Sequence, residues 1–174
     1  MKKVLVVIDM QNDFINGAIG SPAAQAIIPN VAQKIDEYKK SGNDIIFTRD
    51  THERNYLETQ EGKNLPVVHC LEGTPGWQIA SGLNVEGCKI IDKPSFGSIE
   101  LAEYLKNTDY DEIELVGLVS SICVISNALI IKAYLPEIKI TVDASCTAGV
   151  TDEDYKASLV VMKMCHINVL DQRN

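Results

Sequence analysis

Three residues with complementary chemistry follow separate apolar stretches of this 174-residue chain, namely Asp9, Lys93 and Cys123. A cysteine becomes a nucleophile by losing its thiol proton, so it needs a base to accept the proton and a cation that favours the thiolate. Asp9 could supply the base and Lys93 the cation. Each residue alone has an ordinary explanation, because cysteines are commonly small buried hydrophobes and charged residues at strand ends commonly reach water. Together, the three predict a cysteine nucleophile.

The sequence around Cys123 predicts where its thiol lies. The apolar residues 113–119 are typical of a buried strand, and Ser120 and Ser121 are good residues to begin a helix. From Cys123 the sequence is mostly apolar until Pro136, which would end that helix. Cys123 is therefore expected in the first helical turn, where the partial positive charge of the helix N-terminus favours the thiolate.

A second group of residues has the chemistry of a metal site. Asp50 and His52 are two residues apart, so their side chains share one face of an extended segment, and His69 follows another extended stretch. Imidazole and carboxylate ligands together suit zinc, iron or manganese. A pair of surface histidines is the alternative, and the spacing alone leaves both open. Three glutamates follow His52, and charge alone does not choose a further ligand among them.

Two aromatic residues, Phe14 and Trp77, could form the walls of a cavity for a flat substrate. Aromatic side chains bury a large apolar area wherever they lie, so residues of this kind are more often plain core aromatics.

Apolar runs and helical spacing alternate along the chain. The expected strands are residues 3–8, 44–48, 88–92, 113–118, 138–142 and 167–170, and the expected helices are residues 23–40, 98–105, 123–135 and 152–166. Residues 56–66 read as a polar loop, residues 65–70 as a short extended stretch, and residues 77–81 as a helical turn. This pattern predicts one α/β domain over residues 1–174, doubly wound in three layers around a parallel six-stranded sheet. Ligands bind at the carboxyl ends of such strands, where the candidate residues lie.

Composition narrows the classes of partner and compartment. The net charge of −8 argues against nucleic acid and anionic membranes, which are bound by basic surfaces. No apolar window approaches the length of a membrane span, and the apolar run at residues 3–8 is too short for a signal peptide. The five cysteines are odd in number and form no Cys-x-x-Cys pair, so free thiols and a cytoplasmic location are expected.

Six motifs, spread over most of the chain, carry a family resemblance. They are Val-Val-Ile-Asp-Met-Gln-Asn-Asp-Phe at residues 6–14, Thr-Arg-Asp-Thr-His at 48–52, Pro-Val-Val-His-Cys at 66–70, Gly-Thr-Pro-Gly at 73–76, Asp-Lys-Pro-Ser-Phe at 92–96, and Val-Gly-Leu-Val-Ser-Ser-Ile-Cys-Val at 116–124. In this order they resemble the isochorismatase-like cysteine hydrolases, and within them the nicotinamidase branch. The order of the Asp, Lys and Cys motifs is specific, whereas the Gly-Thr-Pro-Gly motif is weak.

The resemblance implies a role for each candidate residue. Asp9, Lys93 and Cys123 match the catalytic triad of the family. The metal ligands match Asp50, His52 and His69, with Glu61 as the best-placed glutamate to join them. The implied cofactor is a divalent transition metal, zinc first and iron or manganese otherwise, with no organic cofactor. A cis bond between Leu118 and Val119 is also implied, and it would place the Val119 and Cys123 amides together as an oxyanion hole.

The implied activity is hydrolysis of a small amide, nicotinamide to nicotinate and ammonia, through a thioester on Cys123. The implied assembly is a homo-oligomer. The sequence departs from the family pattern in two places. Val67 and Val68 precede the second histidine, His69, where the family usually has other residues, and Ser121 stands where the family usually has an acidic residue. Both departures bear on the substrate more than on the triad. The alternatives are another amide or carbamoyl hydrolase on the same triad and a catalytically silent binding domain, because fold alone does not fix function.

Overall fold

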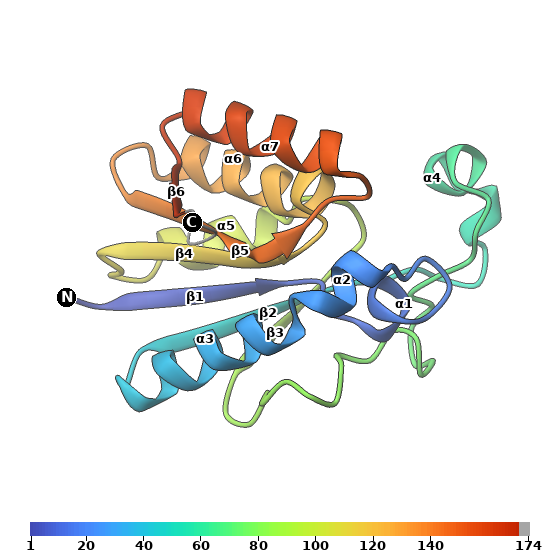
Figure 1. The fold of residues 1–174 in the computed structure, drawn as a ribbon, viewed down its shortest axis with the longest axis horizontal. Helices are drawn as coiled ribbons and strands as arrows, with labels where there is room; N and C mark the ends of the chain where they lie inside the picture. Colours follow the sequence, from blue (N-terminus) through green and yellow to red (C-terminus); the bar gives the residue numbers. More distant parts are fainter. Residues whose placement is uncertain (171–174) are drawn as a thin grey trace.

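The computed structural model describes residues 1–170, in which six parallel strands form one sheet with helices on both faces (Figure 1). The strand order is β3-β2-β1-β4-β5-β6. The strands are β1 (Lys3–Ile8), β2 (Asp44–Asp50), β3 (Lys89–Lys93), β4 (Glu112–Leu118), β5 (Lys139–Ala148) and β6 (Asn168–Leu170). This is the predicted doubly wound α/β fold. The order of strands reverses between β1 and β4, which is where such sheets bind ligands.

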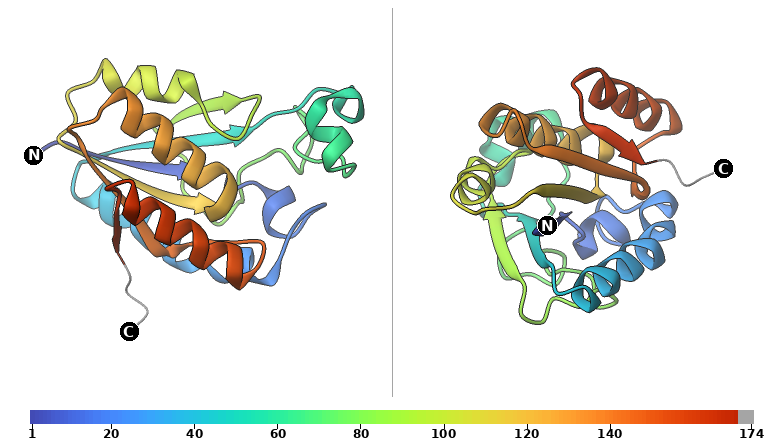
Figure 2. Two further views of the ribbon diagram at one scale, coloured as in Figure 1. Left: turned by 90° about the horizontal axis from the view of Figure 1, so that it is seen from above. Right: turned by 90° about the vertical axis from the view of Figure 1, so that its left-hand side faces the viewer.

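The helices divide into two groups that cover opposite faces of the sheet (Figures 1 and 2). On one face lie α1 (Asn12–Ile15), α2 (Pro22–Ala26) and α3 (Ile28–Lys40), and on the other lie α5 (Ile99–Lys106), α6 (Ile125–Tyr134) and α7 (Asp152–Met164). Alternate residues of β1 serve the two layers, because successive strand side chains point to opposite faces. Val4 and Val6 are buried in the core under α5–α7, and Leu5 and Val7 in the core under α2 and α3.

The predicted helix at residues 23–40 is two helices, α2 and α3, which meet at Ile27. The sequence contains the reason. Pro29 has no N–H to donate inside a continuous helix, and its ring would clash with the preceding turn, but it is tolerated in the first turn of a new helix. Pro29 occupies that position in α3, so the prediction of one helix was wrong at this point.

Two loop predictions also differ from the structure. Within residues 56–66 there are a 3-10 turn, η1 (Tyr56–Glu58), and the short helix α4 (Gln60–Asn64), where Thr59 caps the helix by accepting the Gly62 N–H. In Figure 1, this segment projects from one end of the sheet. Residues 77–81 form no helical turn; Ile79 instead forms an isolated antiparallel bridge with Gln11.

The remaining predictions differ at element ends. Strand β5 runs to Ala148, beyond its predicted end at 142, and the helix predicted to begin at Cys123 is preceded by a π-helical turn, η2 (Ser120–Val124). No helix within residues 1–170 is both long and apolar enough to cross a membrane. The prediction of one domain includes residues 171–174, which lie outside the described residues, and it stays a prediction.

Candidate active site

The three predicted catalytic residues meet at the carboxyl ends of their strands. Lys93 Nζ lies 2.7 Å from Asp9 Oδ2 and donates a hydrogen bond to Cys123 Sγ over 3.5 Å. Exposure is 0% for Asp9, 1% for Lys93 and 3% for Cys123, so water does not separate the groups. The ordinary explanation, a charged residue that reaches water at a strand end, does not hold for Asp9, which forms a buried ion pair with Lys93. The topology explains this, since β1 lies between β2 and β4 in the middle of the sheet, and Asp9 directly follows β1.

The backbone at Asp9 is shaped for this position. Asp9 has a φ of 47°, and on the neighbouring strand Gly117 packs so closely that a Cβ there would collide with the Ile8 carbonyl oxygen. The Asp9 carboxylate is oriented by Thr48, whose hydroxyl donates to Asp9 Oδ1 over 2.6 Å. This role of Thr48 was not among the predictions from the sequence. A polar residue in the apolar run of β2 was the available signal.

Asn127 is a second buried residue that the sequence analysis missed. Its Nδ2 donates to the carbonyl oxygens of Cys123 (2.8 Å) and Phe96 (3.1 Å), and its Oδ1 accepts the Ser98 N–H (2.9 Å). It thereby ties the helix that follows the cysteine to the turn that follows Lys93. Asparagine one helical turn after Cys123, inside an apolar stretch, was the signal for such a role.

Electrostatics determine the protonation states of the triad. Burial raises the pKa of Cys123 well above its usual range, the Asp9 carboxylate raises it further, and Lys93 only partly opposes them. Burial thus opposes the thiolate that the helix N-terminus was expected to favour, so loss of the thiol proton depends on a base beside Cys123. Burial also raises the pKa of Asp9, partly offset by Lys93, which makes its carboxylate a stronger base. For Lys93, burial opposes the charged form, but the charges of Asp9, Cys123 and Asp50 outweigh it and raise its pKa.

The four predicted metal ligands also converge. One ligand atom from each of Asp50, His52, Glu61 and His69 lies within 4.8 Å of the others. His52 Nε2 is 2.9 Å from Asp50 Oδ2 and 3.5 Å from Glu61 Oε1, and His69 Nε2 is 3.6 and 3.7 Å from the same two oxygens. Glu61 comes from α4, in the projecting segment, so the charge pattern alone could not have selected it.

These side chains fit a divalent metal. His69 Nδ1 lies 2.8 Å from the Val67 carbonyl oxygen, which fixes the tautomer and leaves Nε2 free to bind a metal. Two imidazoles and two carboxylates are a donor set typical of zinc, iron or manganese. Asp50 Oδ1 accepts no hydrogen bond from residues 1–170, and Tyr56 packs its ring against both histidines at 4.7 and 5.0 Å. Burial opposes ionisation of Asp50, yet hydrogen bonds from His52 and His69 lower its pKa, so it is a carboxylate.

A small cavity joins the triad to the metal cluster. It has a volume of about 210 Å³. Its lining includes the predicted nucleophile Cys123 and the predicted oxyanion residue Val119. The rest of the lining consists of three cluster residues, Asp50, Glu61 and His69, and six apolar side chains, Phe14, Ile19, Leu65, Phe96, Ile122 and Val150. The Leu118–Val119 peptide bond is cis, as the resemblance implied. Of these apolar residues, the sequence analysis named only Phe14.

Trp77, the other predicted substrate wall, does not line this cavity. Its ring lies under the Arg49 guanidinium at 3.5 Å, and its Nε1 donates to the Thr51 hydroxyl over 2.8 Å. It belongs to the core on the α2–α3 face of the sheet. The alternative explanation, a core aromatic residue, is therefore the one that the structure supports.

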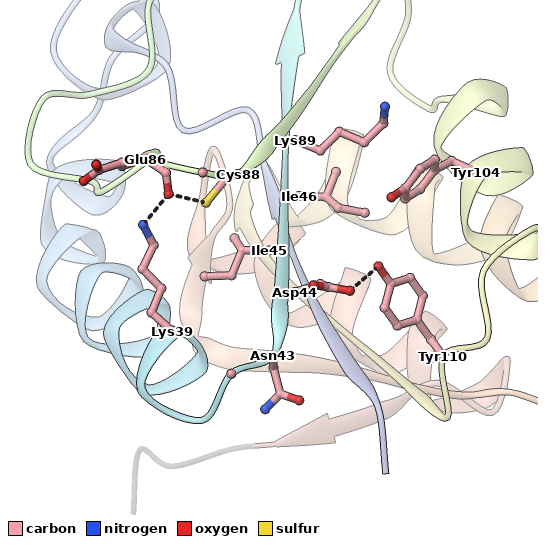
Figure 3. Close-up of a pocket in the computed structure, with 12 residues that line it drawn as sticks. Lys39, Asn43, Asp44, Ile45, Ile46, Glu86, Cys88, Lys89, Tyr104 and Tyr110 are labelled. Atoms are coloured by element: carbon pink, nitrogen blue, oxygen red, sulfur yellow. Dashed lines mark hydrogen bonds between the residues drawn. The ribbon is translucent and has the colours of Figure 1, made fainter.

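A different cavity, of about 420 Å³, lies at the amino ends of β2 and β3, away from the triad (Figure 3). Its polar groups are bonded to one another. Tyr110 donates to Asp44, and Lys39 donates to the Glu86 carbonyl oxygen. The candidate active site is therefore at the carboxyl end of the sheet, where Cys123 and three residues of the metal cluster line one cavity.

Comparison with known proteins agrees with this geometry. The sequence model of the Isochorismatase domain matches residues 3–173. The Saccharomyces cerevisiae nicotinamidase is 26% identical over 98% of this chain and 100% of its own length. An Arabidopsis thaliana protein described as a probable inactive nicotinamidase is 28% identical over 91% of this chain and 87% of its own. The zinc complex of Pyrococcus horikoshii pyrazinamidase superposes with a TM-score of 0.87 at 28% identity, covering 98% and 99% of the two chains.

Proposed function

The chain belongs to the isochorismatase family, and from this we propose that it is a cysteine-dependent hydrolase of a small amide, with nicotinamide as the substrate. One observation carries the proposal. A single ammonium, Lys93 Nζ, contacts both Asp9 and Cys123, and Cys123 lines a cavity that also opens onto Asp50, Glu61 and His69 of the metal cluster. An acid–base group, a nucleophile and a stabilising cation in mutual contact are the parts that covalent hydrolysis needs. The relatives named as nicotinamidase and pyrazinamidase support an amide as substrate.

In the first half-reaction, Asp9 takes the proton from the Cys123 thiol as the sulfur attacks the amide carbonyl carbon. The Val119 and Cys123 amides hold the oxyanion that forms, and such a donor typically contributes roughly 3 kcal/mol. Asp9 then returns the proton to the leaving nitrogen. The carbon–nitrogen bond breaks, ammonia departs and a thioester remains on Cys123.

In the second half-reaction, Asp9 accepts a proton from water, and the water oxygen attacks the thioester carbon. The same two amides hold the oxyanion, and collapse releases the acid and restores the Cys123 thiol. Lys93 stays charged throughout, because Asp9 and Cys123 raise its pKa. Asp50, His52, Glu61 and His69 would hold the metal, which would bind a ring nitrogen of the substrate or a water molecule.

The cavity supports a flat, uncharged substrate. Its apolar walls, Phe14 among them, suit an aromatic ring, while the metal cluster gives one end of the cavity a polar character. An acidic substrate would meet the Asp50 and Glu61 carboxylates, and the small volume limits the ring system. These properties favour nicotinamide over larger amides.

The test is ammonia release across a panel of small amides that includes nicotinamide, pyrazinamide and N-carbamoyl amino acids. Wild-type protein is compared with Cys123→Ala and with Cys165→Ala, a cysteine at the surface. We expect turnover of nicotinamide that only Cys123→Ala abolishes. If only a carbamoyl compound is turned over, the substrate is a carbamoyl compound and not nicotinamide. If no amide is turned over, the result favours a silent binding domain. The Arabidopsis relative described as a probable inactive nicotinamidase is an example of a family member without activity.

We also propose zinc as the metal, a homo-oligomer as the assembly and the cytoplasm as the location. The zinc complex of the Pyrococcus pyrazinamidase supports the first. Elemental analysis, light scattering and cell fractionation test the three in turn.

A further inference from the structure

Val150 stands between two cavities. It lines the cavity that contains Cys123, and it also lines a second cavity of about 190 Å³. The second cavity lies between α2 and the start of α7, with Ala23, Ala26 and Ala148 among its walls. Val150 is 68% exposed, so its side chain is not part of the packed core. Within residues 1–170, Val150 is the one residue common to the two linings, and its side chain is called the partition below.

The backbone of Val150 is held in place by Asp154. The Asp154 carboxylate accepts the N–H groups of Val150 (3.1 Å) and Thr151 (2.6 Å), and it also accepts the hydroxyl of Ser121 (2.7 Å). Ser121 lies in the π-helical turn η2 that carries Cys123. One carboxylate thus fixes the partition to the segment that bears the nucleophile. The Val150 side chain makes none of these bonds, so shortening it leaves them intact.

We propose that Val150 is a specificity-determining residue that ends the substrate cavity and restricts the enzyme to amides on a single ring. This rests on the proposed amide hydrolysis. The catalytic cavity of about 210 Å³ is smaller than the roughly 300–1,000 Å³ of sites for drug-sized ligands, so it accepts a small ring. The second cavity, with its small alanine side chains, offers further space. The Val150 isopropyl group would separate this space from the ring of a substrate in the catalytic cavity.

The consequence is a change in substrate size when the partition is shortened or enlarged. Val150→Ala removes two methyl groups and joins the two cavities, so an amide with an added ring fits across both. Val150→Phe fills the opening and strengthens the restriction. Val160→Ala is the matched control, because Val160 is an exposed valine of α7 that lines neither cavity.

The first measurement is kcat/KM for nicotinamide and for two ring-extended amides, quinoline-3-carboxamide and 5-phenylnicotinamide. We expect Val150→Ala to raise kcat/KM for at least one extended amide, relative to kcat/KM for nicotinamide, by about tenfold. This is the lower end of the discrimination that a small apolar change in a pocket typically produces. Val150→Phe should lower this ratio and Val160→Ala should leave it unchanged. Unchanged ratios in both Val150 variants would overturn the proposal.

A second measurement does not depend on amide turnover. The rate at which Cys123 is alkylated by N-phenyl iodoacetamide is divided by the rate for iodoacetamide, with the labelled residue identified by peptide mapping. We expect this ratio to rise in Val150→Ala and to fall in Val150→Phe. If no protein turns over an amide but the alkylation ratio still responds, the proposed function fails and the role of Val150 holds. If turnover is present and neither ratio responds, the role of Val150 fails alone.

Discussion

The Thr48 hydroxyl donates a hydrogen bond of 2.6 Å to Asp9 Oδ1, and both side chains are fully buried. This bond lowers the pKa of Asp9 against the larger effect of burial, which raises it. Thr48 therefore favours the ionised form of Asp9, and the second carboxylate oxygen lies toward Lys93. A bond of this kind to a charged group contributes roughly 1.5–3 kcal/mol.

Thr48→Val keeps the shape of the side chain and removes that donor. We expect kcat/KM to fall by about tenfold or more, since an energy of roughly 1.5 kcal/mol corresponds to a factor of ten. The acidic limb of the pH profile should move to higher pH, because the pKa of Asp9 rises. Thr48→Ser retains the hydroxyl and should restore both quantities. An unchanged pH profile in Thr48→Val would show that the bond is structural only.

Replacing Asp9 or Lys93 should affect both turnover and folding, because the pair is buried. Asp9→Asn removes the proton acceptor, and turnover should fall by about 10²–10⁴, the usual contribution of general acid–base catalysis. It also leaves Lys93 without its closest counter-charge, and breaking a buried pair in this way costs roughly 3–5 kcal/mol of stability. Lys93→Met should behave similarly, whereas the double variant leaves no unpaired charge and should melt above either single variant. Near-wild-type turnover in Asp9→Asn would remove Asp9 from the mechanism.

The main elements of the fold could be predicted because each strand is an apolar run, and the parallel arrangement follows from strands that alternate with helices. The candidate site could be predicted for the same reason. Asp9, Lys93 and Cys123 each end or follow a strand, and the carboxyl ends of parallel strands lie on one edge of a sheet. The family resemblance is confirmed by the domain match. The break at Ile27 was also present in the sequence, as the proline that begins α3.

Other features depend on contacts between distant segments. Thr48 and Asp9 are 39 residues apart and meet only because β1 and β2 pair in a particular register. Burial of Cys123 opposes the thiolate expected there, and that burial depends on packing between segments far apart in the sequence. Trp77 lies beside Arg49 rather than in the cavity. This position could not be predicted, because Trp77 belongs to an irregular loop and no periodic pattern in the sequence indicates the course of such a loop.

Metal content separates the cluster from a chance grouping of side chains. Purified protein should hold about one transition metal per chain, as expected for a site with three or four protein ligands. His52→Ala should lose most of it after dialysis against a weak chelator. Glu61→Gln should lose less, because Glu61 is the most exposed of the four and lies 3.5 Å or more from the histidine nitrogens. His166→Ala is the control, and elemental analysis that finds equal metal in the wild type and His52→Ala would refute the site.

The pH dependence of stability tests the hydrogen bonds that the Asp154 carboxylate accepts from Ser121, Val150 and Thr151. Although the slight burial of this carboxyl opposes ionisation, hydrogen bonds from Ser121, Thr151 and Val150 lower its pKa. The folded pKa therefore lies below the unfolded value of about 3.9. A carboxyl of this kind contributes stability that is fully present above its unfolded pKa and is lost as pH falls through its folded pKa.

Asp154→Asn should accordingly melt at a lower temperature than the wild type at pH 7, because the amide presents a nitrogen to groups that donate hydrogen bonds. As the pH falls below about 4, the wild type loses this contribution and the difference in Tm should shrink. Asp152→Asn is the control, because Asp152 carries the same charge in the same helical turn but does not accept these hydrogen bonds. The difference in Tm between Asp152→Asn and the wild type should stay small between pH 7 and pH 3. Thermal melts of the three proteins between pH 7 and pH 3 provide the measurement. If the Tm difference for Asp154→Asn were constant over that range, the ionised form of Asp154 would not be what stabilises the hydrogen bonds to its carboxylate.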